Sequence, residues 1–318
     1  MSKTAFITGI TGMDGILLSN FLLHLDYEIV GLVRKQSLDK IKHNEKIKYL
    51  IGDLSFTEEI LEKLNGVQID EFYLLGGETS IEPGWEDFNT TFDINVNSLV
   101  LILEYIRKKS PSSKVFFASS SEIFGNPEIS PQTESSKKKP RNPYGMSKMV
   151  SQQIIEFYRD THRIFACCGI LYNHESEYRR RDVVTKKISS TVAKIYLGQE
   201  SELILGNKNA KRDWTSAKDF VEGMWLTLQI SKPDDYIFSS FVSREVIEMV
   251  KVAFECVGIY DWEKYVKEDE KYFRPSEKID LVGDNTKLKS IGWEQKISFE
   301  EMIKDMVFSD IEKYKKKL

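Results

Sequence analysis

Through residue 171 the chain alternates short apolar runs with longer segments in which apolar residues recur every three or four positions. The short runs predict buried strands, and the longer spacing predicts helices. Strands that alternate with helices predict parallel βαβ units, which right-handed crossovers assemble into a doubly wound parallel α/β sheet. The predicted strands are residues 4–8, 28–33, 47–51, 71–75, 114–118 and 165–171, and the predicted helices are residues 16–25, 57–64, 97–109 and 144–161.

Beyond residue 171 the pattern changes, because polar loops become longer and strands become rare. We therefore predict two domains, with the sheet in residues 1–171 and a smaller α/β domain in residues 172–318, whose elements can cross back into the first. The later part is predicted to contain helices at 184–197, 217–230, 244–257 and 298–314, a strand at 236–240, and polar loops at 173–182 and 261–271.

Composition narrows the possible partners. The chain has 318 residues, a net charge of −4 and a pI near 5.8, which favours neither nucleic acid nor an anionic membrane surface as a partner. No apolar run approaches the ~18 residues of a membrane span, and the first residues lack a signal-peptide pattern. Three cysteines and four scattered histidines fit neither a disulfide framework nor a metal site. We expect a cytoplasmic protein without a bound metal.

Three glycines follow the first predicted strand and precede the first predicted helix. In this context the spacing is typical of a turn that holds the pyrophosphate of a dinucleotide at a helix N-terminus. The alternative is a glycine-rich turn that binds nothing. The predicted binding residues of this turn are Gly9, Thr11, Gly12, Met13, Asp14 and Gly15.

The end of the second predicted strand bears on the choice between NAD and NADP. An NAD site usually has an acidic residue there, whereas this chain has Arg34 and Lys35, with no acid before Asp39. A guanidinium suits a 2′-phosphate, so we predict NADP; the alternative is two solvated bases. After the third strand, Asp53 and Leu54 are predicted to flank the adenine, although Asp53 fits a simple loop acid nearly as well.

Tyr144 and Lys148 lie one helical turn apart on one face of a predicted helix. An ammonium near a phenol favours the phenolate, so we expect Lys148 to lower the pKa of Tyr144 and let it take a proton from a substrate hydroxyl. The same Tyr-x-x-x-Lys spacing occurs twice more, and only the Tyr144 pair follows a polar strand end and opens a helix after a proline. The other matches are Tyr105 with Lys109 and Tyr260 with Lys264.

A polar cluster, Ser119 to Glu122, ends the fifth predicted strand. Hydroxyl groups there would hold a sugar hydroxyl, and Glu122 would serve as a base. The alternative is that the serines cap a turn and Glu122 is solvated.

With these residues the chain resembles the extended short-chain dehydrogenase/reductases, and among them the GDP-mannose 4,6-dehydratase family. The resemblance spans nearly the whole chain and implies a Rossmann fold. The segments that carry it are 8–15, 118–125, 131–132, 140–148, 169–176, 184–188, 205–207, Arg212-Asp213-Trp214 and 272–277.

The resemblance implies that Tyr144 takes the proton of the sugar 4-hydroxyl, Glu122 removes the proton on carbon 5, and water leaves carbon 6. Ser120 stands where the family usually has threonine, and Lys148 orients Tyr144 and contacts the cofactor ribose. Further cofactor contacts are implied for Leu75, Gly76, Gly77, His174 and Arg179, and GDP-sugar contacts for Glu78, Ser121, Asn173, Lys187, Arg212, Arg274 and Glu277. In the family an arginine loop, here 179–181, reaches a neighbouring subunit's cofactor, which implies a dimer or tetramer; the alternative is a solvated basic loop.

One loop departs from the family pattern. Where the family reads Asn-Leu-Ala-Ala-Gln-Ser-His-Val, residues 74–81 read Leu-Leu-Gly-Gly-Glu-Thr-Ser-Ile. The lost methyl and imidazole groups imply a larger or reshaped sugar pocket, so we expect GDP-N-acetylglucosamine as substrate. The chain looks most like the family branch that uses this sugar in legionaminic acid synthesis. The alternative is neutral drift with GDP-mannose retained.

Two other functions stay open on the same fold: a sugar-nucleotide epimerase or reductase, and a non-catalytic NADP-binding protein. Glu122 beside Ser120 argues against the first, because neither reaction needs a base for carbon 5. The set Ser120, Glu122, Tyr144 and Lys148 argues against the second, because a scaffold needs none of them.

Overall fold

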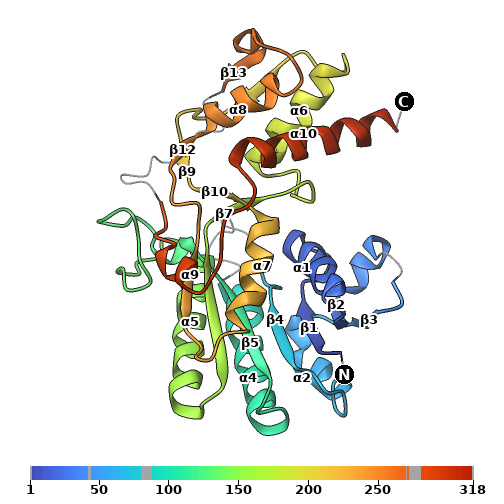
Figure 1. The fold of residues 1–318 in the computed structure, drawn as a ribbon, viewed down its shortest axis with the longest axis vertical. Helices are drawn as coiled ribbons and strands as arrows, with labels where there is room; N and C mark the ends of the chain where they lie inside the picture. Colours follow the sequence, from blue (N-terminus) through green and yellow to red (C-terminus); the bar gives the residue numbers. More distant parts are fainter. Residues whose placement is uncertain (1, 42–43, 80–87, 270, 272–280, 317–318) are drawn as a thin grey trace.

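The computed structural model describes residues 2–41, 44–79, 88–269, 271 and 281–316. Seven strands form one sheet in the order β3-β2-β1-β4-β5-β6-β11, and every neighbouring pair is parallel (Figure 1). The strands are β1 (Thr4–Thr8), β2 (Glu28–Val33), β3 (Ile47–Ile51), β4 (Glu71–Leu74), β5 (Lys114–Ser120), β6 (Phe165–Leu171) and β11 (Asp235–Phe238). The predicted doubly wound sheet is confirmed.

Helices cover both faces of this sheet, which is why its strands are apolar along their length. On β1, Ala5 and Ile7 pack into one core with α1 and α7, whereas Phe6 packs into a second core with α2, α4 and α5. Cys167 and Cys168 of β6 divide between the same two cores. The helices are α1 (Met13–His24), α2 (Thr57–Lys63), α4 (Ser98–Lys109), α5 (Pro143–His162) and α7 (Ala217–Thr227).

The later half of the chain contributes to this sheet through β11 and to its helical cover through α7. Asp235 at the start of β11 accepts hydrogen bonds from Gln152 Nε2 (2.6 Å) and Arg159 (2.8 Å), both on α5. The edge strand is thereby fastened to the helix beside it. The division of the chain at residue 171 remains a prediction.

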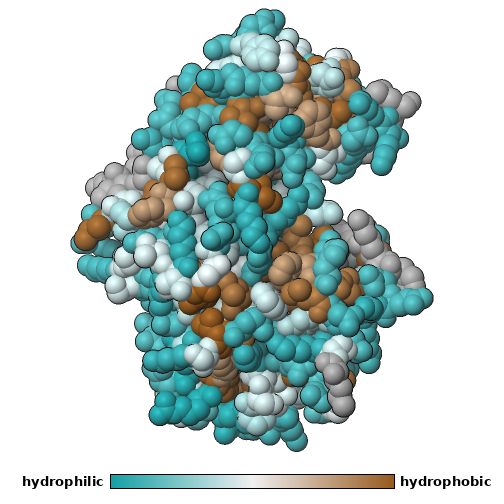
Figure 2. Space-filling view, in the orientation of Figure 1, coloured by the Kyte–Doolittle hydropathy of each residue, from teal (hydrophilic) through white to brown (hydrophobic). Residues whose placement is uncertain are grey.

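A smaller lobe lies above the carboxyl end of the sheet (Figure 1). Its core joins three helices, and the buried Lys186–Asp310 ion pair (2.8 Å) ties two of them together. In Figure 2 the surface is hollowed between this lobe and the sheet. Its elements are α6 (Val184–Tyr196), α8 (Val246–Glu255), α10 (Phe299–Lys315), β8 (Leu203–Leu205) and β13 (Val266–Glu268).

Two short strand pairs connect the lobes. β7 (Asn173–Glu175) runs parallel to β10 (Trp214–Ser216), and β9 (Lys211–Arg212) runs antiparallel to β12 (Arg244–Glu245). Such short pairs escape detection by sequence periodicity because two or three residues carry no recognisable repeat.

The remaining short elements were also missed or given as loops. Residues 261–271 are not a loop throughout, because they contain the short helix η6 and β13, which pairs in parallel with β8. The other short elements are α3 (Phe88–Phe92), α9 (Thr286–Ser290), the π-helical turn η4 (Asp93–Asn97), and the 3-10 helices η1 (Lys35–Lys40), η2 (Leu54–Phe56), η5 (Ser121–Ile123) and η6 (Trp262–Tyr265).

Candidate active site

The glycine turn after β1 is closely packed against its neighbours. Gly9 has φ +72°, and a Cβ there would lie 2.9 Å from Gly76 Cα. A Cβ on Gly15 would lie 2.3 Å from the Gly9 carbonyl oxygen, so only glycine lets α1 approach the turn this closely. Gly12 is exposed and begins α1 without a side-chain cap. The first N–H groups of the helix are therefore available to an anion, and this cradle fits a dinucleotide pyrophosphate.

The loop after β4 packs on this turn from the other side. Gly76 N donates to Thr8 Oγ1 (2.8 Å). Asn95, from η4, accepts from Glu78 N (2.9 Å) and donates to the Glu78 carbonyl (3.0 Å) and to Ser147 Oγ (2.9 Å). The loop is thus fastened to both the glycine turn and α5.

A methyl group on Gly76 or Gly77 would meet the protein's own atoms rather than open space. A Cβ on Gly76 would lie 3.0 Å from Gly9 N and 3.2 Å from Thr8 Oγ1, and one on Gly77 would lie 2.6 Å from Asn95 Oδ1. The space that a methyl group would take is filled by the protein's own atoms. The histidine replacement at Ser80 lies outside the described residues.

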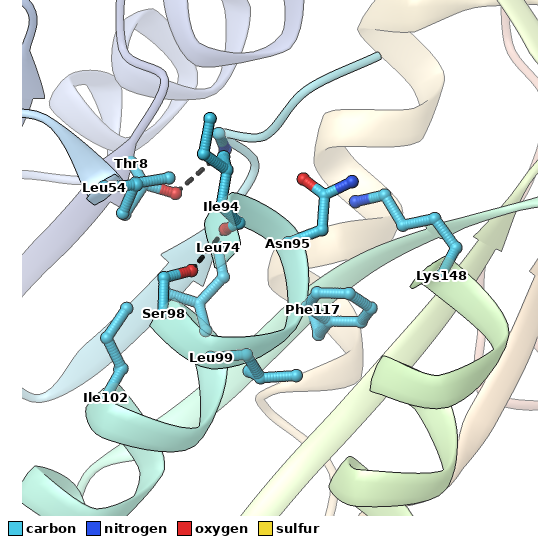
Figure 3. Close-up of a pocket in the computed structure, with 11 residues that line it drawn as sticks. Thr8, Leu54, Leu74, Ile94, Asn95, Ser98, Leu99, Ile102, Phe117 and Lys148 are labelled. Atoms are coloured by element: carbon cyan, nitrogen blue, oxygen red, sulfur yellow. Dashed lines mark hydrogen bonds between the residues drawn. The ribbon is translucent and has the colours of Figure 1, made fainter. Parts of the chain in front are cut away.

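A pocket between β1, β4, η4 and α5 brings several predicted cofactor residues together (Figure 3). Leu54, Gly76 and Lys148 all line it, and Figure 3 shows the Lys148 side chain directed toward that of Asn95. The π-helical turn supplies Asn95 to this wall, as such turns often do at functional sites.

Lys148 is buried beside Tyr144 on the first turns of α5. Its ammonium donates to the Ala118 carbonyl (2.7 Å) and lies 4.8 Å from the Phe117 ring centroid and 5.8 Å from the Tyr144 ring centroid. Burial lowers the pKa of Lys148 to about 8.

Tyr144 titrates in the opposite direction from the one expected. Burial raises its pKa to about 12 and the Glu122 charge adds to this, while a hydrogen bond with Ser120 and the Arg179 charge act against it. The Lys148 ammonium is turned to the Ala118 carbonyl. With its pKa raised to about 12, Tyr144 is protonated at neutral pH.

Ser120 and Glu122 meet Tyr144 at the end of β5. Ser120 Oγ accepts from Glu122 N (3.2 Å) and so caps η5, which is the alternative role considered for the serines. It also bonds the Tyr144 hydroxyl, so the capping and site roles coexist. Glu122 is half-buried and accepts from Asn142 Nδ2 (2.9 Å). Ser121 is buried in the same turn.

His174 joins the glycine turn to the smaller lobe. Its Nε2 lies 3.0 Å from both Asp14 oxygens, and its Nδ1 lies 2.7 Å from the Tyr172 carbonyl. Burial alone would lower the pKa of His174, but the Asp14 charge and hydrogen bond outweigh it and raise the pKa; His174 correspondingly lowers the pKa of Asp14. Arg179 pairs with the buried Glu175 (3.0 Å) and acts electrostatically on Asp14 and Tyr144.

Residues predicted to hold the GDP-sugar gather only in part. Asn173 begins β7 and faces Trp214 in the adjacent strand, two residues beyond Arg212. Lys187 is half-buried in the first turn of α6. Arg274 and Glu277 lie outside the described residues.

The adenine end is less constrained. Arg34 is exposed directly after β2, where the 2′-phosphate was predicted. The Asp53 carboxylate accepts from Ser55 N (3.0 Å), which is the turn-capping role of a simple loop acid. Of the other tyrosines with the same spacing, Tyr105 donates to the Leu64 carbonyl and Tyr260 is 74% exposed.

Within the described ranges, no group of three or more His, Cys, Asp or Glu could hold a metal ion. None of the helices described is both long and apolar enough to cross a bilayer. The three cysteines are free thiols.

The parallel sheet, the glycine turn and the Tyr-x-x-x-Lys pair define an extended short-chain dehydrogenase/reductase. The family model described as GDP-mannose 4,6 dehydratase matches residues 6–306. GDP-mannose 4,6 dehydratase 1 of Arabidopsis thaliana is 38% identical over 98% of this chain and 90% of its own, and the Homo sapiens GDP-mannose 4,6 dehydratase is 36% identical over 98% and 92%. The chain belongs to the GDP-mannose 4,6-dehydratase family, which confirms the family resemblance.

Solved structures support the same fold. A dTDP-glucose 4,6-dehydratase from Bacillus anthracis, in complex with NAD, superposes with a TM-score of 0.84 at 19% identity and covers 99% of this chain and 98% of its own. At this identity the likeness establishes the architecture alone.

Two residues of the site were missed in the sequence. Asn95 has no motif that points to it, because its partners lie 17 and 52 positions away. Asn142 carried a signal: an asparagine directly before Pro143 is the usual start of a helix, with the asparagine as cap and proline in the first turn.

The His174–Asp14 pair predicts a pH-dependent stability. A histidine whose pKa is raised by folding stabilises the fold fully at pH values below its unfolded pKa of about 6.5, and this effect is lost as the pH rises through its folded pKa. An aspartate whose pKa is lowered by folding stabilises the fold at pH values above its unfolded pKa of about 3.9. His174→Gln should therefore cost about 1.5–3 kcal/mol between roughly pH 4 and 6.5, and less at higher pH. Urea unfolding of the protein across this range measures the difference.

His24→Gln is the control, because His24 is exposed and its Nδ1 lies 2.7 Å from the Asn20 carbonyl of its own helix. A loss of stability by His174→Gln that does not change with pH would contradict the ion pair.

Proposed function

We propose that this chain is an NADP-dependent 4,6-dehydratase that converts a GDP-hexose to its 4-keto-6-deoxy product. The observation that carries the proposal is the meeting of Glu122, Ser120 and Tyr144 at the carboxyl end of β5. An epimerase or reductase needs a tyrosine there but has no use for a second, carboxylate base. Membership in the family supports the same reaction.

The proposed chemistry divides the two proton transfers between two residues. Tyr144, oriented by Ser120, takes the proton of the 4-hydroxyl. Glu122 removes the proton on carbon 5 after the ketone has acidified it, and the carbon 6 hydroxyl leaves with that proton as water. NADP, when bound, would accept a hydride from carbon 4 and return it to carbon 6, while Tyr144 gives up its proton and carbon 5 takes one up. Because Tyr144 is protonated in the protein alone, it becomes a base only once ligand binding lowers its pKa.

The residues that would hold the cofactor come from several elements. The α1 N-terminus and its glycine turn suit the pyrophosphate, and Lys148 suits the nicotinamide ribose. Arg34, exposed after β2, suits the 2′-phosphate and is the reason for proposing NADP.

GDP-mannose is the better supported hexose. The relatives at 36% and 38% identity carry that name, and they span nearly this whole chain. The filled space behind Gly76 and Gly77 removes part of the case for a bulkier group on carbon 2. GDP-N-acetylglucosamine, the substrate of the legionaminic acid branch, remains the second candidate because Ser80 replaces the histidine of the family pattern.

We also propose a homo-oligomer, a dimer or tetramer, with residues 179–181 near the interface. Arg179 is held by Glu175 of its own chain, whereas Arg180 is exposed and pairs with Asp182. A loop that is fixed at one arginine and exposed at the next suits a contact with a second subunit.

Incubation with each sugar tests the function directly. We expect purified protein with NADP to remove one water from GDP-mannose and to act more slowly on GDP-N-acetylglucosamine. Mass spectrometry measures the loss of water from each sugar. A preference for the acetamido sugar would reverse the choice of hexose. No mass change with either sugar, in protein that binds NADP, would refute the dehydratase.

Glu122→Gln separates binding from elimination. The amide keeps the shape of the side chain but cannot take the carbon 5 proton, so turnover should fall roughly a hundredfold to ten-thousandfold. Calorimetry should give unchanged affinities for NADP and the GDP-sugar. Glu128→Gln, an exposed glutamate with a surface lysine partner, is the control. Full turnover by Glu122→Gln would disprove its role as base.

Arg34→Ala tests the choice of cofactor. Loss of a charge-assisted contact should weaken NADP binding by about tenfold to a hundredfold and leave NAD binding unchanged. Lys35→Ala should have a smaller effect. If calorimetry shows that Arg34→Ala weakens the binding of NADP and NAD equally, Arg34 does not contact the 2′-phosphate.

A further inference from the structure

One side chain connects the proposed carbon 5 base to the helix that carries the tyrosine. Asn142 Oδ1 accepts from Gly145 N (2.7 Å), and Asn142 Nδ2 donates to Glu122 Oε2 (2.9 Å). The same amide therefore caps α5 and holds the Glu122 carboxylate.

The orientation of this amide follows from its partners. The Gly145 N–H can only donate, so it must face the amide oxygen, and the carboxylate can only accept, so it must face the amide nitrogen. A flipped amide would oppose donor to donor at one end and acceptor to acceptor at the other. Both contacts are therefore specified together.

The backbone reinforces this link. A Cβ on Gly145 would lie 2.6 Å from the Glu122 carbonyl oxygen, so the first turn of α5 packs directly on η5. Pro143 fixes the helix start after Asn142, and Tyr144 follows at the next position. The contacts of Asn142 and its neighbours Pro143 and Gly145 thus fix the separation of Glu122 and Tyr144.

We infer that Asn142 is a positioning residue for the elimination step, holding the Glu122 carboxylate in place against the start of α5. This inference rests on the proposed dehydratase function. Asn142 itself acts on no atom of the sugar; it acts through Glu122, whose carboxylate it holds.

Glu122 lies among other charged and titratable groups of the site. On α5 it faces Tyr144, whose pKa its charge raises. Arg179, after β7, and Asp14, on α1, act on the same tyrosine hydroxyl. A new negative charge at position 142 would therefore fall directly on Glu122 and Tyr144.

Two substitutions separate the contact with Glu122 from the helix cap. Asp at 142 keeps a capping oxygen and the side-chain shape but turns the donor into a carboxylate. Ser keeps the cap but is too short to reach Glu122 as well. Asn44→Asp is the matched control, because Asn44 Oδ1 also accepts from a backbone N–H, that of Lys46 (2.9 Å), away from the site.

We expect Asn142→Ser to lower kcat for dehydration by about tenfold to a hundredfold with KM little changed. Asn142→Asp should lower kcat further and move the acid limb of the kcat–pH profile to higher pH. Carbon-13 titration of the Glu122 carboxyl should give a higher pKa in Asn142→Asp than in the unaltered protein. Thermal unfolding should be similar in all variants.

Failure of the proposed function and failure of the Asn142 inference give different results. A protein that dehydrates neither sugar refutes the proposed function, and the Glu122 titration then decides the contact by itself. An active protein in which Asn142→Asp changes neither the Glu122 titration nor kcat overturns the inference. A shifted titration with unchanged kcat also overturns it, because the contact would then position nothing.

Discussion

The site depends on the packing of the first turn of α5 against the turn after β5. Gly145 allows the approach, and Asn142 locks it with one hydrogen bond to each side. Because β5 lies in the middle of the sheet and α5 is a 20-residue helix buried along one face, both parts are held by the core. Glu122, the proposed base for carbon 5, therefore stands at a fixed place beside Tyr144.

The same rigidity extends to the cofactor side. The loop after β4 is tied to the glycine turn through Thr8 and to α5 through Asn95, while His174 ties the turn to β7. These contacts link the sheet, the helix and the smaller lobe around one edge. Loss of any of these contacts would shift the groups that meet at this edge. The contacts therefore preorganise the site.

Much of the fold follows from sequence pattern. β2, β3 and β6 begin and end where the apolar runs do, because strands buried on both faces must be apolar throughout. Tyr144 could be chosen among three matches because it alone follows a polar strand end and opens a helix. Short pairs such as β8 with β13 escaped because pairing there depends on tertiary neighbours.

The electrostatics of the site did not follow from sequence. His174 meets Asp14 across 160 positions, and no local pattern encodes that contact. The pKa of Tyr144 was expected to fall beside Lys148, yet burial raises it while the ammonium bonds a carbonyl. Likewise the glycines at 76 and 77 suggested empty space, whereas their neighbours occupy it. The direction of a pKa shift and the space beside a glycine both depend on how the chain packs, and the spacing of residues along the sequence does not specify that packing.

The central claim is that a carboxylate removes the proton of carbon 5 within this site. GDP-mannose deuterated at carbon 5 tests it most directly, with early product analysed by mass spectrometry in ordinary water. The account predicts that every molecule that loses water also loses the deuterium, and that turnover slows with the label. Dehydrated product that keeps its deuterium would contradict the account.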